Sequence, residues 1–275
     1  MAIFRTRSFL AALLFVAAIS SSSLLAVEII AHRGASYDAP ENTFASFKLG
    51  WKQNADADEL DIWLSKDGKM VVFHDDNTKR IAGVNQRVAE QTFAELRTLD
   101  AGIWKGAAWK GERIPTLEEA LATQPPRKRM FIEIKCGPEI LAELERVLRE
   151  SGKTPAELVI IGFGYETMKA AKARFPQIPV FWLVSPEKES RGEKPGVEEL
   201  VAKTKEARLD GLNLNFKFAI DEAFVRHVKG AGLKLYVWTV DDAKVAQRVA
   251  GLGVDGITTN RPEWLRAQLA GAAVD

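Results

Sequence analysis

Residues 130–162, MFIEIKCGPEILAELERVLRESGKTPAELVIIG, contain the repeating unit from which the fold can be inferred. An apolar run at Met130–Lys135 is followed by an amphipathic helical pattern over Pro138–Glu150 and by a second apolar run at Leu158–Gly162. This order is typical of a strand, a helix and a second strand. The two strands are predicted to be parallel, because the helix supplies the long crossover that a parallel pair requires.

The same alternation extends over nearly the whole chain. Eight short apolar runs occur, at Glu28–His32, Glu59–Trp63, Met130–Lys135, Leu158–Gly162, Val180–Val184, Gly211–Leu214, Leu235–Thr239 and Gly256–Thr258. The later gaps carry further helical patterns, at Tyr165–Arg174, Val197–Ala207, Asp221–Ala231 and Asp242–Leu252. Eight such units in about 250 residues predict a closed TIM (β/α)8 barrel. An open doubly wound sheet is the alternative, although no Gly-rich phosphate loop joins a predicted strand to a helix.

One additional apolar run, Met70–His74, breaks this alternation. It follows the second predicted strand too closely for a parallel crossover, so the two runs must form an antiparallel hairpin. Asp67-Gly68 is a frequent two-residue hairpin turn, and counting outward from it places Asp61 opposite His74. Residues 75–113 lack clear strand periodicity and are predicted to form a small insertion in the barrel.

The composition limits the possible partners. The 275 residues are 47% hydrophobic and 27% charged, with a formal net charge of +1. These values are typical of a soluble globular protein and make nucleic acid an unexpected partner. The single cysteine, Cys136, excludes an internal disulfide and a cysteine-rich zinc site. Its position in a predicted strand indicates a small buried residue rather than a nucleophile.

The first 26 residues differ from the rest of the chain. Arg5 and Arg7 precede an apolar run over Phe9–Ile19, and a segment rich in small residues follows up to Ala26. This layout is typical of a secretory signal peptide, and the apolar run is short for a membrane span. We expect residues 1–26 to be a signal peptide and residues 27–275 to be a periplasmic or secreted barrel without membrane insertion. An uncleaved membrane anchor is the alternative.

Charged residues gather at the predicted C-terminal ends of the early strands, where TIM barrels carry their active sites. Residues two apart on a strand share a face. Glu59 and Asp61 of the second predicted strand therefore point to one side, and so do Glu133 and Lys135 of the third barrel strand. The full set is His32, Arg33, Glu59, Asp61, His74, Glu133 and Lys135.

The types of residue in this set indicate a particular chemistry. Three carboxylates suit one hard divalent cation such as Ca²⁺ or Mg²⁺. The arginine and the lysine beside it would bind a phosphate, and the two histidines can serve as general base and general acid. Each residue alone could equally be a surface group or an ion-paired one. Charges inside the otherwise apolar run Met130–Lys135 are nevertheless costly without partners, so the set as a whole indicates phosphodiester hydrolysis.

These residues also carry a resemblance to the glycerophosphodiester phosphodiesterase family, in particular to its secreted or periplasmic bacterial members. It covers about residues 28–265. In chain order the similar motifs are Ala31-His32-Arg33-Gly34-Ala35, Ala39-Pro40-Glu41-Asn42-Thr43, Ala57-Asp58-Glu59-Leu60-Asp61-Ile62, Lys66-Asp67-Gly68, Val71-Val72-Phe73-His74-Asp75, Gly111-Glu112-Arg113-Ile114-Pro115-Thr116-Leu117-Glu118-Glu119, Ile132-Glu133-Ile134-Lys135, Val237-Trp238-Thr239-Val240 and Gly253-Val254-Asp255-Gly256-Ile257.

The resemblance implies a TIM barrel with a small insertion and a metal-dependent reaction that releases sn-glycerol 3-phosphate and an alcohol. By position, it implies Glu59, Asp61 and Glu133 for the cation, His32 and His74 for acid and base, Arg33 and Lys135 for the phosphate, and Trp238 for the glycerol or alcohol pocket. We assign His32 as the base and His74 as the acid. Glu41 is placed near the metal, where it would order His32 or bind substrate. The attacking group is either water or the glycerol 2-hydroxyl.

Two short segments depart from the family pattern. Gly162-Phe163 stands where the family often has Ser-Phe, and Thr259-Asn260-Arg261-Pro262 stands where it often has Thr-Asp-x-Pro. Neither segment is expected to touch the metal or the histidines, so both are expected to bear on substrate details alone.

Three other functions compete with this interpretation. A phospholipase D-like or sphingomyelinase D-like enzyme would use a similar site, but the secreted ones usually carry disulfides; an exposed apolar rim at the barrel mouth would favour this function. A non-catalytic phosphate-binding barrel would be expected to lack a histidine or a metal ligand. A metal-dependent aldolase or sugar isomerase would leave the two histidines unexplained. The sequence does not indicate an oligomeric state.

Overall fold

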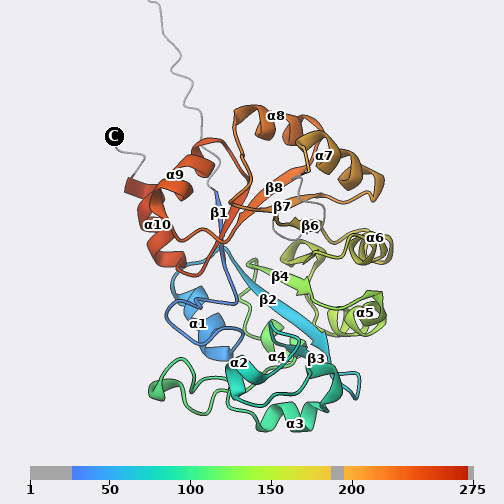
Figure 1. The fold of residues 1–275 in the computed structure, drawn as a ribbon, viewed down its shortest axis with the longest axis vertical. Helices are drawn as coiled ribbons and strands as arrows, with labels where there is room; N and C mark the ends of the chain where they lie inside the picture. The colour runs from blue at the N-terminus through green and yellow to red at the C-terminus, as the bar shows by residue number, and fades with distance from the viewer. Residues whose placement is uncertain (1–26, 187–194, 272–275) are drawn as a thin grey trace, which may run out of the picture.

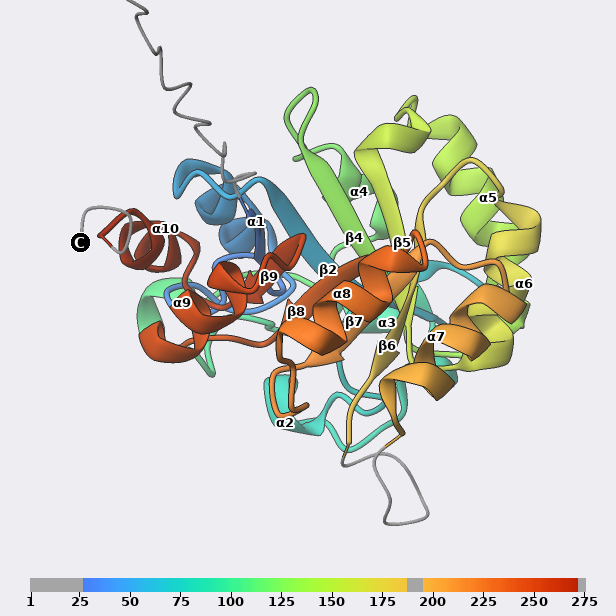
Figure 2. The same cartoon turned by 90° about the horizontal axis from the view of Figure 1, so that it is seen from above.

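The computed structural model describes residues 27–186 and 195–271, in which eight parallel strands form a closed barrel covered by helices (Figures 1 and 2). The barrel strands are β1 (Glu28–Ala31), β2 (Ala57–Leu64), β4 (Arg129–Ile134), β5 (Leu158–Gly162), β6 (Val180–Val184), β7 (Gly211–Asn215), β8 (Lys234–Trp238) and β9 (Gly256–Thr259). Neighbours follow the order β1-β9-β8-β7-β6-β5-β4-β2, and pairing of β1 with β2 closes the ring. The predicted TIM barrel is confirmed.

A helix packs on the outside of the barrel after each barrel strand or its hairpin. These helices are α1 (Phe44–Lys52), α4 (Leu117–Leu121), α5 (Leu141–Glu150), α6 (Tyr165–Arg174), α7 (Val197–Glu206), α8 (Glu222–Gly230), α9 (Ala243–Gly251) and α10 (Pro262–Gly271), with 3-10 turns at Pro138–Ile140 and Pro155–Glu157. Several begin at a side chain that accepts a backbone N–H, such as Thr43 before α1 and Asp242 before α9. No described helix is long and apolar enough to cross a membrane. The predicted signal peptide, residues 1–26, lies outside the described residues.

The predicted hairpin is present, but its turn differs from the prediction. Strand β3 (Met70–Val72) runs antiparallel to the end of β2. The loop has three residues, Lys66–Gly68, because the Ser65 N–H already donates to the Lys69 carbonyl at 2.9 Å. Gly68 has a φ of 74°, the left-handed conformation that closes such a loop and that glycine adopts without strain.

This longer loop shifts the register of the hairpin by one residue. Leu64 pairs with Met70, and the Phe73 N–H donates to the Asp61 carbonyl at 3.0 Å. The predicted pairing of Asp61 with His74 is therefore wrong. The ladder ends at Val72, so His74 lies beyond it, where its direction is no longer set by strand pairing.

Residues 75–113 fold over the outer side of the hairpin. They contain α2 (Lys79–Ala82), α3 (Phe93–Thr98) and 3-10 turns at Val88–Glu90 and Ala107–Trp109, and they lie around β3 at one side of the barrel (Figure 1). A small apolar cluster holds them there, separate from the barrel core and formed by Val71, Phe73, Ile81, Val88, Leu96, Ala101 and Ile114. The insertion thus has its own core, which extends from β3.

An aromatic layer fills the barrel below its C-terminal mouth. The rings of Phe181 and Tyr236 stack with centroids 4.8 Å apart, and Phe131 meets Tyr236 edge-on at 5.4 Å. Beneath this layer, Glu28 accepts from Arg129 at 2.7 Å and from the Tyr236 hydroxyl at 2.8 Å. Aromatic packing and an ion pair therefore support the polar groups at the mouth from below.

We expect Phe181→Ala to lower the free energy of unfolding by about 3–5 kcal/mol, because it leaves a cavity in this layer. Tyr236→Phe, which removes only the hydroxyl and its hydrogen bonds, should cost about 1 kcal/mol. Urea unfolding followed by circular dichroism measures both. Equal losses in the two variants would show that the aromatic layer does not support the barrel.

Candidate active site

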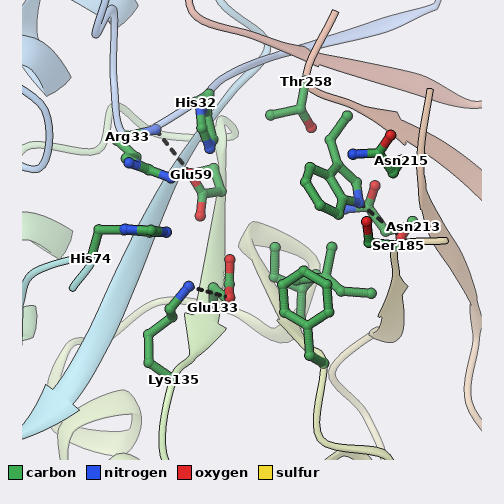
Figure 3. A pocket seen from close by; sticks show the side chains of 14 residues that line it. His32, Arg33, Glu59, His74, Glu133, Lys135, Ser185, Asn213, Asn215 and Thr258 are labelled. Carbon is green, nitrogen blue, oxygen red and sulfur yellow. Dashed lines mark hydrogen bonds and ion pairs between the residues drawn. The ribbon is translucent and has the colours of Figure 1, made fainter. Parts of the chain in front are cut away.

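A cavity of about 280 Å³ opens at the C-terminal ends of the barrel strands (Figure 3). Charged and ionisable side chains from the first strands line one half of it, and these are His32, Arg33, Glu59, His74, Glu133 and Lys135. Neutral side chains from β5 to β9 line the other half, and these are Ile161, Phe163, Leu183, Ser185, Asn213, Asn215, Trp238 and Thr258. The cavity therefore offers an ionic wall and a neutral wall to one ligand.

The three acidic residues proposed as metal ligands lie together in the charged half. Ligand oxygens of Glu59, Asp61 and Glu133 lie within 4.8 Å of one another, and all three residues are buried. The parallel register sets Asp61 beside Glu133, and Glu59 lies two residues earlier on the same face of β2. This placement follows from the two-residue period of the strands.

The carboxylates of this cluster repel one another in a buried setting. Burial raises the pKa of Glu133 to about 7, and the nearby Asp61 charge adds to that rise. Burial and the same charge raise the pKa of Glu59 well above its usual range. Burial would also raise the pKa of Asp61, but Lys135 and Arg33 outweigh it and lower that pKa. The charged form of Asp61 is thus favoured, whereas burial and the neighbouring acidic groups disfavour the charged forms of Glu59 and Glu133. This donor set fits a hard divalent cation.

Two cationic side chains lie at the edge of the acidic cluster. The Lys135 Nζ is 2.7 Å from Glu133 and 3.4 Å from Asp61, and the Arg33 Nε is also 3.4 Å from Asp61. Glu41 accepts from Arg33 at 2.9 Å and from Arg80, so it orders Arg33 rather than His32. Lys135 and Arg33 line the cavity, where they can bind an anionic group such as a phosphate.

The backbone conformation of Arg33 and Gly34 fixes the turn that follows β1. Both residues adopt left-handed φ angles, 55° and 76°. A side chain at Gly34 would place its Cβ 2.4 Å from the Ser46 carbonyl carbon, so only glycine fits against α1. The Arg33 N–H donates to Glu59 at 2.8 Å, which ties this turn to the acidic cluster.

The two histidines point toward the acidic residues from different sides (Figure 3). The Nδ1 of His32 lies 2.7 Å from Asn260 Oδ1, and the Nδ1 of His74 lies 2.7 Å from Asp75 Oδ1. Burial, reinforced by Arg33, lowers the pKa of His32 to about 4, and burial also lowers the pKa of His74. Because Nδ1 of each ring is engaged, each leaves Nε2 for chemistry in the cavity.

The contact between Asn260 and His32 contradicts the expectation that the last motif touches neither histidine. Closure of the barrel sets β9 beside β1, with Thr259 opposite Ala31, and the His32 N–H donates to the Thr259 carbonyl at 2.8 Å. The residue after β9 therefore meets the residue after β1. The position of Asn260, two residues after the eighth predicted strand, could have indicated this contact.

Of the residues in the neutral half of the cavity, Trp238 was the one assigned to a substrate pocket from the sequence. Its Nε1 donates to the Asn213 carbonyl at 3.0 Å, and its ring meets Phe163 edge-on at 5.6 Å. The side-chain oxygen of Asn213 is buried and has no hydrogen-bond partner among the described residues. The polar members of this wall were not predicted from the sequence, and these are Ser185, Asn213, Asn215 and Thr258. For Ser185, Asn215 and Thr258, a place at or near the C-terminal end of a strand was the available indication.

The other residues with reactive side chains lie elsewhere. Cys136 follows β4 and is half-buried; burial and the Glu139 charge raise the pKa of its thiol to about 11, which does not suit a nucleophile. His227 is exposed on α8.

Comparison with known proteins agrees with this geometry. The model of the glycerophosphoryl diester phosphodiesterase family matches residues 32–264. The chain belongs to this family. This chain is 35% identical over 241 residues to the glycerophosphodiester phosphodiesterase homologue YhdW of Bacillus subtilis. The match covers 86% of this chain and 96% of YhdW. This chain is also 34% identical over 242 residues to a glycerophosphodiester phosphodiesterase of Caldanaerobacter subterraneus, covering 86% and 95%.

A solved structure extends this similarity to the fold. A phosphodiesterase of Oleispira antarctica, in complex with the product sn-glycerol-3-phosphate, superposes with a TM-score of 0.80 at 31% identity. The match covers 88% of this chain and 96% of the Oleispira chain. The described barrel is therefore the fold of an enzyme of this family.

We expect Ca²⁺ or Mg²⁺ to raise the melting temperature of the phosphodiesterase, because a cation that binds only the folded state stabilises it. The rise should be larger at pH 8 than at pH 6, since Glu133, with a pKa of about 7, binds a cation only after losing its proton. Differential scanning fluorimetry measures both effects. Glu133→Gln should remove most of the rise, whereas Glu222→Gln, on the exposed face of α8, should keep it. An unchanged rise in Glu133→Gln would refute the proposed cation site.

Proposed function

We propose that the chain hydrolyses glycerophosphodiesters to sn-glycerol 3-phosphate and an alcohol, with His32 as general base and His74 as general acid. The observation that carries this proposal is the arrangement of two half-buried imidazoles around three convergent carboxylates. The family match and the product complex of the Oleispira enzyme support glycerophosphodiesters as the substrate class.

The acidic cluster would hold one divalent cation, Ca²⁺ or Mg²⁺, through Glu59, Asp61 and Glu133. When bound, the cation would polarise the phosphate and offset the charge that develops on it. Arg33 and Lys135 would orient the phosphate from the same wall. Both are held by ion pairs with the acidic residues, so little side-chain freedom is lost when the phosphate binds.

The partners of the two histidines support the assignment of their roles. Asp75 accepts from His74 and is itself bound by Arg80 at 2.7 Å. A carboxylate partner favours the imidazolium that a general acid needs. His32 has a neutral amide partner, and its low pKa keeps the ring uncharged, as a general base requires. The attacking hydroxyl, of water or of glycerol, would lose its proton to His32, and the leaving alcohol would gain one from His74.

The neutral wall would accommodate the organic part of the substrate. Trp238 and Phe163 offer apolar ring surface, and the unpartnered Asn213 oxygen can accept from a hydroxyl. Glycerol has both carbon–hydrogen surface and hydroxyl groups, so its chemistry matches this wall. These contacts would place the phosphate of the diester over the ionic wall.

A second candidate, hydrolysis of lysophospholipids, is favoured by one feature of the mouth. Exposed large apolar side chains of the described residues include the adjacent pair Ile103 and Trp104. The Arg80 guanidinium lies 5.9 Å from the Trp104 ring and also binds Asp75, the partner of His74. An exposed indole next to the site could contact a lipid surface.

We propose a periplasmic or secreted location. The arginines and the apolar run within residues 1–26 support it. Cell fractionation of the full chain tests this location.

We expect His32→Ala and His74→Ala each to lower kcat on glycerophosphocholine by about 10²–10⁴-fold, the usual contribution of a general acid or base. The melting temperatures should stay close to that of the wild type, because both rings face the cavity. His227→Ala, on the exposed face of α8, is the matched control and should retain activity. Near wild-type turnover in either active-site variant would exclude the proposed roles.

We expect soluble glycerophosphocholine to be hydrolysed to sn-glycerol 3-phosphate faster than lysophosphatidylcholine micelles are hydrolysed to acylated glycerol 3-phosphate. The reason is that the described cavity measures only about 280 Å³, which is small for an acyl chain. Coupled assays of both substrates at matched concentration measure the ratio. Preference for the micelles, reduced specifically by Trp104→Ala, would favour the lysophospholipid function instead.

A further inference from the structure

Behind His32 lies a row of hydrogen bonds that the proposed reaction does not yet use. His32 Nδ1 is 2.7 Å from Asn260 Oδ1, and the Asn260 side-chain nitrogen donates to Asp241 Oδ2. Asp241 follows β8 and Asn260 follows β9, so the closed barrel brings both to the His32 side of the mouth. The row runs from the cavity to the surface, where Asp241 is exposed.

The contacts of Asp241 fix which way the Asn260 amide faces. Asp241 Oδ1 accepts the Asn260 backbone N–H at 2.9 Å and the Thr259 hydroxyl at 2.8 Å. Asp241 Oδ2 can only accept, so the nitrogen of the Asn260 side chain must face it. The amide oxygen then faces inward, where the Ser36 hydroxyl also donates to it at 2.8 Å. Every donor and acceptor in the row agrees with this single orientation.

We propose that Asp241 and Asn260 are positioning residues that hold His32 in the tautomer with hydrogen on Nδ1. An amide oxygen opposite Nδ1 requires a hydrogen there, which leaves the Nε2 lone pair free toward the cavity. This proposal deepens the proposed function, because it rests on His32 acting as the base. In the reaction, Nε2 forms a new N–H bond as the O–H bond of the attacking hydroxyl breaks. The resulting imidazolium keeps its Nδ1 hydrogen bond to Asn260.

The neutral amide also sets the charge environment of the base. The charged or titratable groups that face His32 are Arg33 on its own loop, Asp61 on β2 and His74 after β3. Asp241 is separated from the ring by Asn260 and is exposed, so solvent screens its charge. Asp241 therefore acts on His32 through the orientation of the amide. His74, by contrast, has a carboxylate directly against its Nδ1.

The single substitution Asp241→Asn tests the orientation. In this variant, the single side-chain oxygen at position 241 would accept from the Asn260 backbone N–H, whose position is fixed. The new amide nitrogen at position 241 would then face the Asn260 side chain. Asn260 would turn its oxygen outward and its nitrogen toward His32, which forces the hydrogen onto Nε2. We expect kcat to fall by at least about 10-fold with little change in KM, because a wrong tautomer disables the base.

The double substitution Asn260→Asp with Asp241→Asn should reverse this loss. Asn at position 241 can donate to Asp at position 260, whose other oxygen accepts from His32 Nδ1. The hydrogen returns to Nδ1, but a carboxylate now adjoins the ring. We expect kcat to recover at alkaline pH, with the acidic limb of the kcat/KM profile moved up by about 1 pH unit or more.

The tautomer can be read without an activity assay, which separates this proposal from the proposed function. The chain has three histidines, so ¹⁵N-histidine nuclear magnetic resonance spectra can be assigned with His74→Ala and His227→Ala variants. We expect Nδ1–H at His32 in the wild type and in the double variant, and Nε2–H in Asp241→Asn. Asp242→Asn is the matched control, because Asp242 caps α9 and has no bond to Asn260.

An Nε2–H tautomer in the wild type, or the same tautomer in the wild type and Asp241→Asn, would overturn the proposal. The proposal would also be overturned if the double variant kept the low kcat of Asp241→Asn, or if the acidic limb of its kcat/KM profile stayed at the wild-type pH. If the tautomers change as expected while no variant, including the wild type, turns over glycerophosphocholine, the positioning role stands and the proposed function fails.

Discussion

Mutual repulsion of three buried carboxylates is the constraint on which the rest of this site depends. Glu59, Asp61 and Glu133 occupy inward positions that a barrel normally fills with apolar side chains, and their ligand oxygens lie within 4.8 Å of one another. Lys135 and Arg33 offset part of the charge but leave two of the three acids with raised pKa values. The remaining need for positive charge suits this wall to a hard divalent cation.

The closed ring of strands organises the groups around that cluster. Neighbouring early strands supply the charged wall, and the later strands supply neutral side chains, so one cavity has an ionic half and a neutral half. Ring closure also joins the first and last strands, which brings Asn260 to His32 across 228 positions of sequence. The aromatic layer of Phe131, Phe181 and Tyr236 supports this assembly from below.

Much of this arrangement could be predicted from the sequence, because strand periodicity is local. The two-residue period placed Glu59 with Asp61 and Glu133 with Lys135, and eight apolar runs indicated the barrel. The hairpin register was wrong because a left-handed Gly68 adds a residue to the loop, and sequence does not distinguish the two turn types there. Asn260 and Asn213 were missed because their contacts arise only when distant strands become neighbours. Amide side chains also carry no pattern that marks them as cavity residues.

The end of the β3 ladder at Val72 has a consequence for how such an enzyme can diversify. His32 directly follows the barrel strand β1. His74 instead follows the hairpin strand β3, and its partner Asp75 is bound by Arg80 of the insertion, residues 75–113. The two imidazoles thus belong to separately packed pieces of the chain. Replacement or lengthening of residues 75–113 would alter the surroundings of His74 while the acidic cluster and His32 keep their scaffold. The segment packs around its own apolar cluster, apart from the barrel core, so its sequence can vary without replacing a residue of that core.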